Sequence, residues 1–153
     1  MLIYNPLQIV LVTCRGKSVA MGRVREHHDI LATSWQCPAS DSPPLYSVFL
    51  SNKHDLSLIR SSKVFCVNFM AYEHRAQAAF CARHIGDHID KFQETELTLK
   101  ECEKIDCPRI GEAVGYIECE VIEEHITGDH VLFVGKVLNS DVRDANAKRL
   151  MQE

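Results

Sequence analysis

The sequence predicts a mainly-β protein folded as a small barrel. Short runs rich in Val, Ile, Leu and aromatic residues, the residue types that favour strands, recur along the chain. Turn signals separate these runs, and only one substantial helical segment interrupts them. This succession favours a small barrel over a doubly wound parallel sheet.

Six runs are expected to form strands, at Leu7–Cys14, Ile30–Cys37, Leu45–Leu50, Val64–Phe69, Tyr116–Ile122 and Val131–Leu138. The clearest alternation, over residues 117–121, predicts that Glu118 and Glu120 face solvent opposite three apolar side chains. Turns are expected at Arg15-Gly16-Lys17, Asp41-Ser42-Pro43-Pro44, Thr127-Gly128-Asp129 and Asn139-Ser140-Asp141.

Two helices are expected in the middle of the chain. The first runs from about Asp55 to Ser61, with Asp55 or Asn52 able to cap its N-terminus. The second is amphipathic and runs from Ala71 to about His84. Its apolar face is expected to hold Tyr72, Ala76, Ala79 and Phe80. Residues 93–107 are charged and irregular, so we expect a surface excursion there.

Composition indicates one soluble globular domain over residues 1–153. Apolar residues make up 46% of the chain and charged residues 25%, which excludes a disordered or collagen-like protein. The formal net charge is −4 and no Lys or Arg cluster stands out, so nucleic acid is not an expected partner.

No membrane association or export is expected. The longest apolar runs fall far short of the roughly 18 residues that a membrane-spanning helix needs. The N-terminus lacks the basic region and the cleavage site of a signal peptide, so cytoplasmic residence is the default expectation. Seven cysteines, an odd number without dense spacing, are expected to be mostly reduced thiols. Cys66 and Cys119 lie in apolar runs, where cysteine acts as a small hydrophobe.

The first candidate site is Ala32-Thr33-Ser34-Trp35, where a strand approaches a proline-rich turn. Consecutive hydroxyl residues can offer donors to the polar edge of a heterocycle, and Trp35 can add an amphipathic wall. The alternative is a strand that runs into a turn with Trp35 in the core. Glycine-rich nucleotide-binding loops are missing from the sequence, so a Rossmann or P-loop cofactor site is not expected.

The second candidate site is Ser51-Asn52-Lys53-His54, followed by Ser57. A strand ends here and a helix begins, so helix N–H groups, Lys53 and the two serine hydroxyls could converge on a phosphate. The alternative is a solvated helix cap. His130 enters a strand from a glycine turn and could donate a proton or position a ligand, or it could serve only the turn.

Metal binding is a weaker alternative. Cys81, His84 and His88 are suitable zinc ligands, but no fourth ligand is obvious, so no metal site is expected. The pair His27-His28 is expected in an exposed loop.

Taken in order, these segments resemble the flavin reductase-like family of FMN-binding split-barrel flavoproteins, which includes flavoredoxin-like and ferric reductase-like proteins. The resemblance covers roughly residues 7–142. Its parts are Val12 to Gly16, Ala32 to Trp35 with Pro38, Ser40 and Pro43-Pro44, Ser51 to His54, Val67-Asn68, the helix, Asp90-Lys91-Phe92, Glu118-Cys119, Gly128-Asp129-His130 and Phe133 to Val137.

The resemblance implies a six-stranded antiparallel split β-barrel of Greek-key type, which forms a homodimer with FMN at the subunit interface. It places Ala32, Thr33, Ser34 and Trp35 along the isoalloxazine edge. It places Ser51, Asn52, Lys53, His54 and Ser57 at the ribityl chain and phosphate, with Lys53 as the counter-charge.

The implied function is an oxidoreductase that passes reducing equivalents from NADH or NADPH through FMN to a flavin or another acceptor. His130 is the candidate for nicotinamide positioning or proton delivery. The alternative is a non-catalytic FMN-binding or electron-carrier module. One departure from the family is the hairpin from Lys17 to Asp29, which is longer and more charged and is expected to alter access to the flavin.

Overall fold

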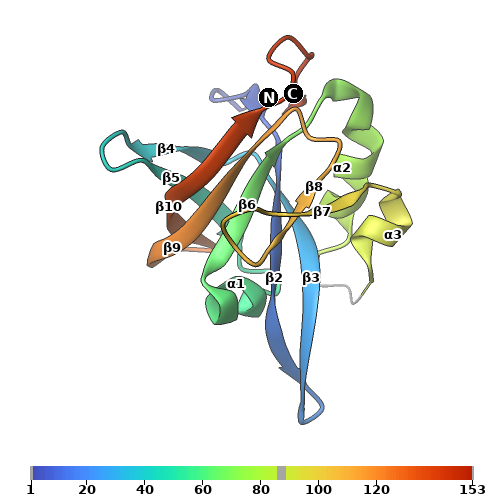
Figure 1. The fold of residues 1–153 in the computed structure, drawn as a ribbon, viewed down its shortest axis with the longest axis vertical. Coiled ribbons are helices and arrows are strands. Elements are labelled where there is room, and N and C mark those ends of the chain that lie inside the picture. The colour runs from blue at the N-terminus through green and yellow to red at the C-terminus, as the bar shows by residue number, and fades with distance from the viewer. Residues whose placement is uncertain (1, 86–88, 153) are drawn as a thin grey trace.

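A computed structural model describes residues 2–85 and 89–152, drawn as a ribbon in Figure 1. The strands are β1 (Leu7–Gln8), β2 (Val10–Ala20), β3 (Arg23–Thr33), β4 (Gln36–Ser40), β5 (Leu45–Ser51), β6 (Val64–Phe69), β7 (Leu99–Glu101), β8 (Pro108–Ile110), β9 (Gly115–Thr127), β10 (His130–Val142) and β11 (Met151–Gln152). The helices are α1 (Ser57–Ser62), a 3-10 turn η1 (Tyr72–His74), α2 (Arg75–Arg83) and α3 (Lys91–Thr95). The mainly-β prediction is confirmed.

One antiparallel sheet dominates the molecule, and its seven strands run in the order β3-β2-β6-β9-β10-β5-β4. The predicted run Ile30–Cys37 is divided between two strands, because the chain bends at Ser34 and Trp35. Strands β3 and β4 are consecutive in the chain but stand at opposite edges of the sheet, and within the described residues they do not pair. The sheet is therefore curled but not closed into a barrel, and it does not have the expected six strands.

The main core fills the inside of this curl. All seven sheet strands except β4 contribute buried apolar side chains to it, and α1 adds Leu58 and Ile59. Phe65 on β6 and Phe133 on β10 are fully buried within it. Removing such side chains from water supplies the main favourable free energy of folding, about 1.5–3 kcal/mol for each large apolar residue.

A second layer covers the outer face of β2 and β3. Helices α2 and α3 lie on this side (Figure 1), and Cys81, Phe92 and Ile110 pack there against Leu11 and Ile30. The expectation that residues 93–107 form only a surface excursion is wrong. This stretch contains the end of α3, strand β7 and the buried Leu97 and Cys107, because the outer face of the sheet needs apolar cover.

Gly16 lies inside β2, so the predicted turn at Arg15-Gly16-Lys17 is wrong. A Cβ atom at position 16 would overlap with the carbonyl oxygen of Leu58 in α1. The neighbouring amide of Lys17 donates a 2.8 Å hydrogen bond to Ser61 Oγ on the same helix. Glycine is required here for close approach of α1 to the sheet, not for a turn.

Glu118 is fully buried, contrary to the prediction of a solvent-facing carboxylate. It accepts hydrogen bonds from the amides of Glu103 (3.1 Å) and Lys104 (2.7 Å) and from Asn139 Nδ2 (2.9 Å). Asn139 stands opposite it on β10, which continues to Val142. The predicted turn at 139–141 is therefore wrong, because these polar residues serve strand pairing and a buried acid. Glu120 is exposed as expected.

The amphipathic helix is found, but with another buried face. It begins at Arg75 after a 3-10 turn, and its buried residues are Ala78 and Cys81. The predicted apolar face is wrong, since Tyr72 is 39% exposed and its ring lies under the cations of Arg75 and Lys148. The turns at 41–44 and 127–129 are confirmed, and Cys66 and Cys119 are buried as expected.

The β2–β3 hairpin projects from the body of the molecule (Figure 1). Its strands pair without interruption to Ala20 and Arg23, and the turn residues Met21 and Gly22 have φ of 53° and 76°, as a two-residue hairpin turn requires. His27 and His28 lie in β3 and not in a loop. The described helices are all too short or too polar to cross a bilayer.

Candidate functional site

The corner between β3 and β4 is fastened to β5. Thr33 Oγ1 donates a 2.8 Å hydrogen bond to the carbonyl of Phe49 and accepts one of 3.1 Å from the amide of Trp35. The amide of Phe49 donates in turn to the carbonyl of Trp35 at 2.8 Å. Thr33 thus fixes the bend, while the hydroxyl of Ser34 binds Gln152.

Trp35 is not in the core. Trp35 is 39% exposed to solvent. Its indole stacks on the imidazole of His130, with ring centroids 4.4 Å apart and planes inclined by 33°. The ring of Tyr4 meets the indole edge-on at 6.3 Å. Trp35, His130 and Tyr4 therefore form an accessible aromatic wall, against which a planar ligand could lie.

The Ser51–Ser57 segment lies beside the same wall. Ser51 ends β5 directly opposite His130 of β10, and the amide of Asn52 donates to the carbonyl of Asp129 at 2.9 Å. The amide of Lys53 donates to Ser51 Oγ at 3.2 Å, so the loop turns tightly. The side chain of Lys53 is exposed.

Helix α1 begins at Ser57, two residues later than expected. Asp55 Oδ1 accepts hydrogen bonds from the amide of Ser57 (3.1 Å) and from its hydroxyl (2.5 Å). The expected capping by Asp55 is found in this form, although the residue at the N-cap position is Leu56. The hydroxyl of Ser57 is therefore engaged within the chain.

His54 is buried below this loop, 6% exposed. Burial lowers the pKa of His54 to about 4, and the nearby charges of Lys91 and His130 act in the same direction. Its imidazole is accordingly neutral at pH 7, and its buried Nδ1 atom has no hydrogen-bond partner within the described residues. His54 is a group that a bound ligand could still satisfy.

His130 is oriented by its neighbour. Its Nδ1 atom lies 2.7 Å from a carboxylate oxygen of Asp129, and its side chain is 21% exposed. The hydrogen bond from His130 lowers the pKa of Asp129, and Lys53 lowers it slightly further. A carboxylate at Nδ1 assigns the proton to that nitrogen and leaves Nε2 for exchange with a ligand.

A buried ion pair was not anticipated from the sequence. Lys91 Nζ lies 2.8 Å from Asp29 Oδ1 and donates to the carbonyl of Ile30 at 2.8 Å, while Lys91 is only 1% exposed. Burial raises the pKa of Asp29, and Lys91 opposes that rise. The only signal in the sequence was the charge of Asp29 at the start of an apolar run, and nothing there pointed to a partner 62 residues away.

Most of the predicted site residues are brought together. Trp35, at the corner that includes Thr33 and Ser34, stacks on His130, and Ser51 at the start of the following loop pairs with His130. Ala32 is an exception, because its side chain packs toward the outer cluster with Leu11 and only its backbone is near the corner.

The cysteine and histidines considered for zinc do not form a recognisable site. Cys81 is buried, the ring of His84 stacks on Phe80 at 4.1 Å, and His88 lies outside the described residues. No three His, Cys, Asp or Glu residues in ranges 2–85 and 89–152 are arranged to hold a metal ion.

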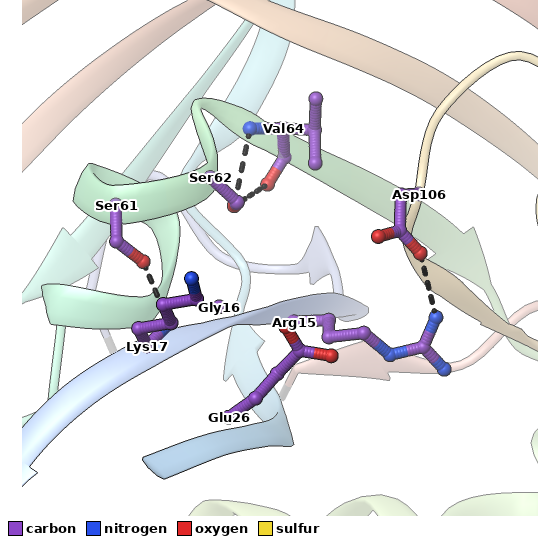
Figure 2. A pocket seen from close by; sticks show the side chains of 8 residues that line it. All are labelled: Arg15, Gly16, Lys17, Glu26, Ser61, Ser62, Val64 and Asp106. Carbon is purple, nitrogen blue, oxygen red and sulfur yellow. Dashed lines mark hydrogen bonds and ion pairs between the residues drawn. The ribbon is translucent and has the colours of Figure 1, made fainter. Parts of the chain in front are cut away.

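A cavity of about 300 Å³ lies elsewhere, between β2 and α1 (Figure 2). Its walls include Arg15, Lys17, Glu26, Ser61 and Asp106, and none of the predicted site residues. Arg15 is paired with Glu101 at 2.6 Å and Asp106 at 3.0 Å, so its charge is already neutralised. We therefore place the candidate site at the aromatic wall and not in this cavity.

The chain is similar to a known protein family, to a protein of known sequence and to solved structures. A family model described as flavin reductase like domain matches residues 4–152. An uncharacterized protein of Archaeoglobus fulgidus is 32% identical over 121 residues, which cover 78% of this chain and 68% of that protein.

Two crystal structures share the fold. One is an FMN-binding protein from Thermus thermophilus with bound 1-cyclohex-2-enone, 25% identical, with a TM-score of 0.76 over 92% of this chain and 73% of that one. The other is the flavin reductase HpaC in complex with NADP+, also 25% identical, with a TM-score of 0.75 over 96% of this chain and 85% of that one.

Proposed function

The chain belongs to the flavin reductase like domain family, and on that basis we propose that it is an FMN-binding oxidoreductase. It passes reducing equivalents from NADH or NADPH through FMN to a flavin or another acceptor. The observation that carries the proposal is the convergence of the Trp35–His130 wall with the Ser51–Lys53 loop. Two similar proteins support it, one described as an FMN-binding protein and the other as a flavin reductase complexed with NADP+.

The residues present fit FMN. The exposed indole of Trp35 would offer an apolar surface to the flavin ring, and the Ala32–Trp35 corner would face its polar edge. The hydroxyl of Ser51 and the cation of Lys53 are available to the ribityl chain and phosphate, whereas the amides of Asn52 and Lys53 are already hydrogen-bonded within the chain. The buried Nδ1 of His54 has no hydrogen-bond partner in the described part of the chain, which supports a ligand that brings a further polar group to this loop.

FMN, when bound, supplies the exchange of a hydride with a nicotinamide and of electrons with an acceptor. The residues of the chain would bind and orient the flavin and exclude water from it. Asp129 would hold the imidazole of His130 through its Nδ1–H, which leaves Nε2 available to a bound ligand. Ser57, whose hydroxyl binds Asp55, shapes the loop and is not itself a phosphate donor.

We further propose one domain over residues 1–153, a split-barrel homodimer with the flavin between subunits, and a cytoplasmic location. The dimer is supported by the openness of the site on one chain, since Trp35 is 39% exposed and Lys53 is also exposed. Apolar side chains on the hairpins, with Ile126 76% exposed and Val24 65% exposed, are available to a second copy.

Anaerobic titration tests the function. The purified protein loaded with FMN is mixed with NADH or NADPH, and the visible absorption of oxidised flavin is followed. Bleaching that exceeds the rate with free FMN supports the oxidoreductase. Tight FMN binding without bleaching by either nucleotide would leave a non-catalytic FMN-binding module, and no FMN binding at all would contradict both.

A further inference from the structure

Three cysteine thiols meet on the outer face of the sheet, away from the proposed flavin site. Cys66 on β6 and Cys107 beside β8 are fully buried, and Cys102 beside β7 is partly exposed. Cys107 Sγ donates to the carbonyl oxygens of Thr13 (3.3 Å) and Pro108 (3.4 Å), and Cys66 Sγ donates to Asn68 Oδ1 at 4.0 Å. Ile105 and Tyr116 surround the cluster. Nothing in the proposed flavin chemistry uses these residues.

Cys102 and Cys107 stand directly opposite each other at the open end of the β7–β8 ladder. Glu101 pairs with Pro108, so the next positions along the ladder are the two cysteines. The amide of Cys102 donates a 2.9 Å hydrogen bond to the carbonyl of Cys107. Opposed residues in an antiparallel ladder have Cα atoms roughly 4.5–5.5 Å apart, which lies within the roughly 4.4–6.8 Å that a disulfide spans.

Exposure and electrostatics distinguish Cys102 from the other two thiols. The neighbouring thiols of Cys107 and Cys66 lower the pKa of Cys102, with a further contribution from Arg109, against the opposing effects of burial and Glu118. Burial raises the pKa of both Cys107 and Cys66 well above the usual range. Cys102 is therefore the thiol of the cluster that loses its proton most readily, and it is also the member that solvent reaches.

We propose that Cys102, the solvent-accessible member of the opposed pair, is a peroxide-reactive cysteine that forms a reversible disulfide with Cys107. The Cys102 thiolate attacks one oxygen of hydrogen peroxide or an organic hydroperoxide, which yields Cys102 sulfenic acid and releases hydroxide or alkoxide. Cys107 Sγ then attacks the sulfenic sulfur, the S–S bond forms, and the sulfenic oxygen leaves as water. Two thiols are oxidised by two electrons in total, and one peroxide is reduced by two.

The disulfide would close the loop of residues 103–106, which already contributes contacts to the fold. The four residues between the cysteines include Glu103 and Lys104, whose amides hold the buried carboxylate of Glu118. They also include Asp106, which pairs with Arg15 at 3.0 Å. Oxidation would therefore tie this loop to the sheet and raise the melting temperature, by about 5 °C for a loop of this length.

Peptide mapping tests the proposal on the wild-type chain. The protein is exposed to one equivalent of hydrogen peroxide at pH 6, quenched with an alkylating agent and digested with trypsin. Because trypsin cleaves after Lys104, the disulfide should join peptides 101–104 and 105–109, with a mass two hydrogens below their sum. At pH 6 Cys102 should react about tenfold faster than glutathione, since an ordinary thiol is then almost entirely protonated.

Variants identify the attacking sulfur. In Cys107→Ser the sulfenic acid on Cys102 should persist and be labelled by dimedone, whereas Cys102→Ser should abolish both products. Cys37→Ser removes an exposed thiol of β4 and should leave the yield unchanged. Linkage of Cys102 to Cys66, preferential oxidation of Cys37, or a wild-type digest without the 101–104 and 105–109 pair would overturn the proposal, even if Cys107→Ser does not fold.

Discussion

The indole of Trp35 stacks on the imidazole of His130 at a centroid distance of 4.4 Å, and one strand holds both rings in place. Phe49 of β5 hydrogen-bonds Trp35 through its amide and Thr33 through its carbonyl, and Ser51, two residues further, pairs with His130. Residues two apart on a strand point to the same face. Strand β5 therefore positions both the Thr33–Trp35 corner and His130.

Lys53→Ala should weaken FMN binding about tenfold and leave riboflavin binding nearly unchanged. Lys53 is the cation of the Ser51–Ser57 loop, and only FMN carries the phosphate that this cation would bind. A charge-assisted hydrogen bond at an exposed position contributes about 1.5 kcal/mol, which corresponds to that factor. Isothermal titration with both ligands measures the difference.

Lys136→Ala is the matched control, because Lys136 is an exposed lysine on β10, the same strand as His130. It removes the same charge and should change neither affinity. Equal losses of FMN and riboflavin affinity in Lys53→Ala would show that Lys53 does not face the phosphate.

Lys91→Met should destabilise the fold by about 3–5 kcal/mol. The substitution keeps much of the side-chain volume but leaves the buried Asp29 without its cation, which is the costly way to break such a pair. Urea denaturation monitored by circular dichroism measures the loss.

The double variant Asp29→Leu with Lys91→Met removes both charges and should lose less stability than Lys91→Met alone. Lys100→Met, at an exposed position on β7, should stay within about 0.5 kcal/mol of wild type. A double variant that is no better than the single one would mean that the 2.8 Å contact is not a buried ion pair in solution.

His54 should make the protein less stable in mild acid. Its pKa is about 4 in the folded state against about 6.5 in an unfolded chain, so between these values the unfolded state binds more protons. The stabilising contribution is complete above pH 6.5 and is lost as the pH falls toward 4, with about 2 kcal/mol gone at pH 5.

The difference in unfolding free energy between wild type and His54→Phe separates the contribution of His54 from that of other titratable groups. One of these is Asp29, whose raised pKa acts in the opposite direction. Urea unfolding at pH 7.5 and pH 5 should show a loss about 2 kcal/mol smaller in His54→Phe than in wild type. Identical losses in the two proteins would exclude a depressed pKa at His54.

The strands were largely predictable because their side chains obey local rules. The predicted runs Leu45–Leu50 and Val64–Phe69 are mostly apolar, and they form β5 and β6 almost as expected. Both segments of the candidate site were also predictable from the sequence, because each is short and continuous. One contains two hydroxyl residues next to Trp35, and the other contains a lysine just before a helix.

The errors share one cause, which is that a partner distant in the sequence decides the role of the residue. Glu118 looks like a surface acid until Asn139 and the amides of the β7–β8 loop reach it. Gly16 looks like a turn until α1 packs on it, and Lys91 gives no sign of its pairing with Asp29. Sequence periodicity reports on one strand or helix at a time and contains no such information.

The fluorescence of Trp35 tests the central claim most directly, because it is the only tryptophan in the chain. A flavin that lies against the indole quenches its emission, so titration with FMN should produce a loss that saturates at one FMN per chain. The melting temperature should begin to rise at FMN concentrations near the half-saturation of this quenching and should continue to rise above it, because stabilisation grows as the logarithm of ligand concentration above Kd. FMN that raises the melting temperature while Trp35 emission stays unchanged would place the flavin elsewhere and contradict the account.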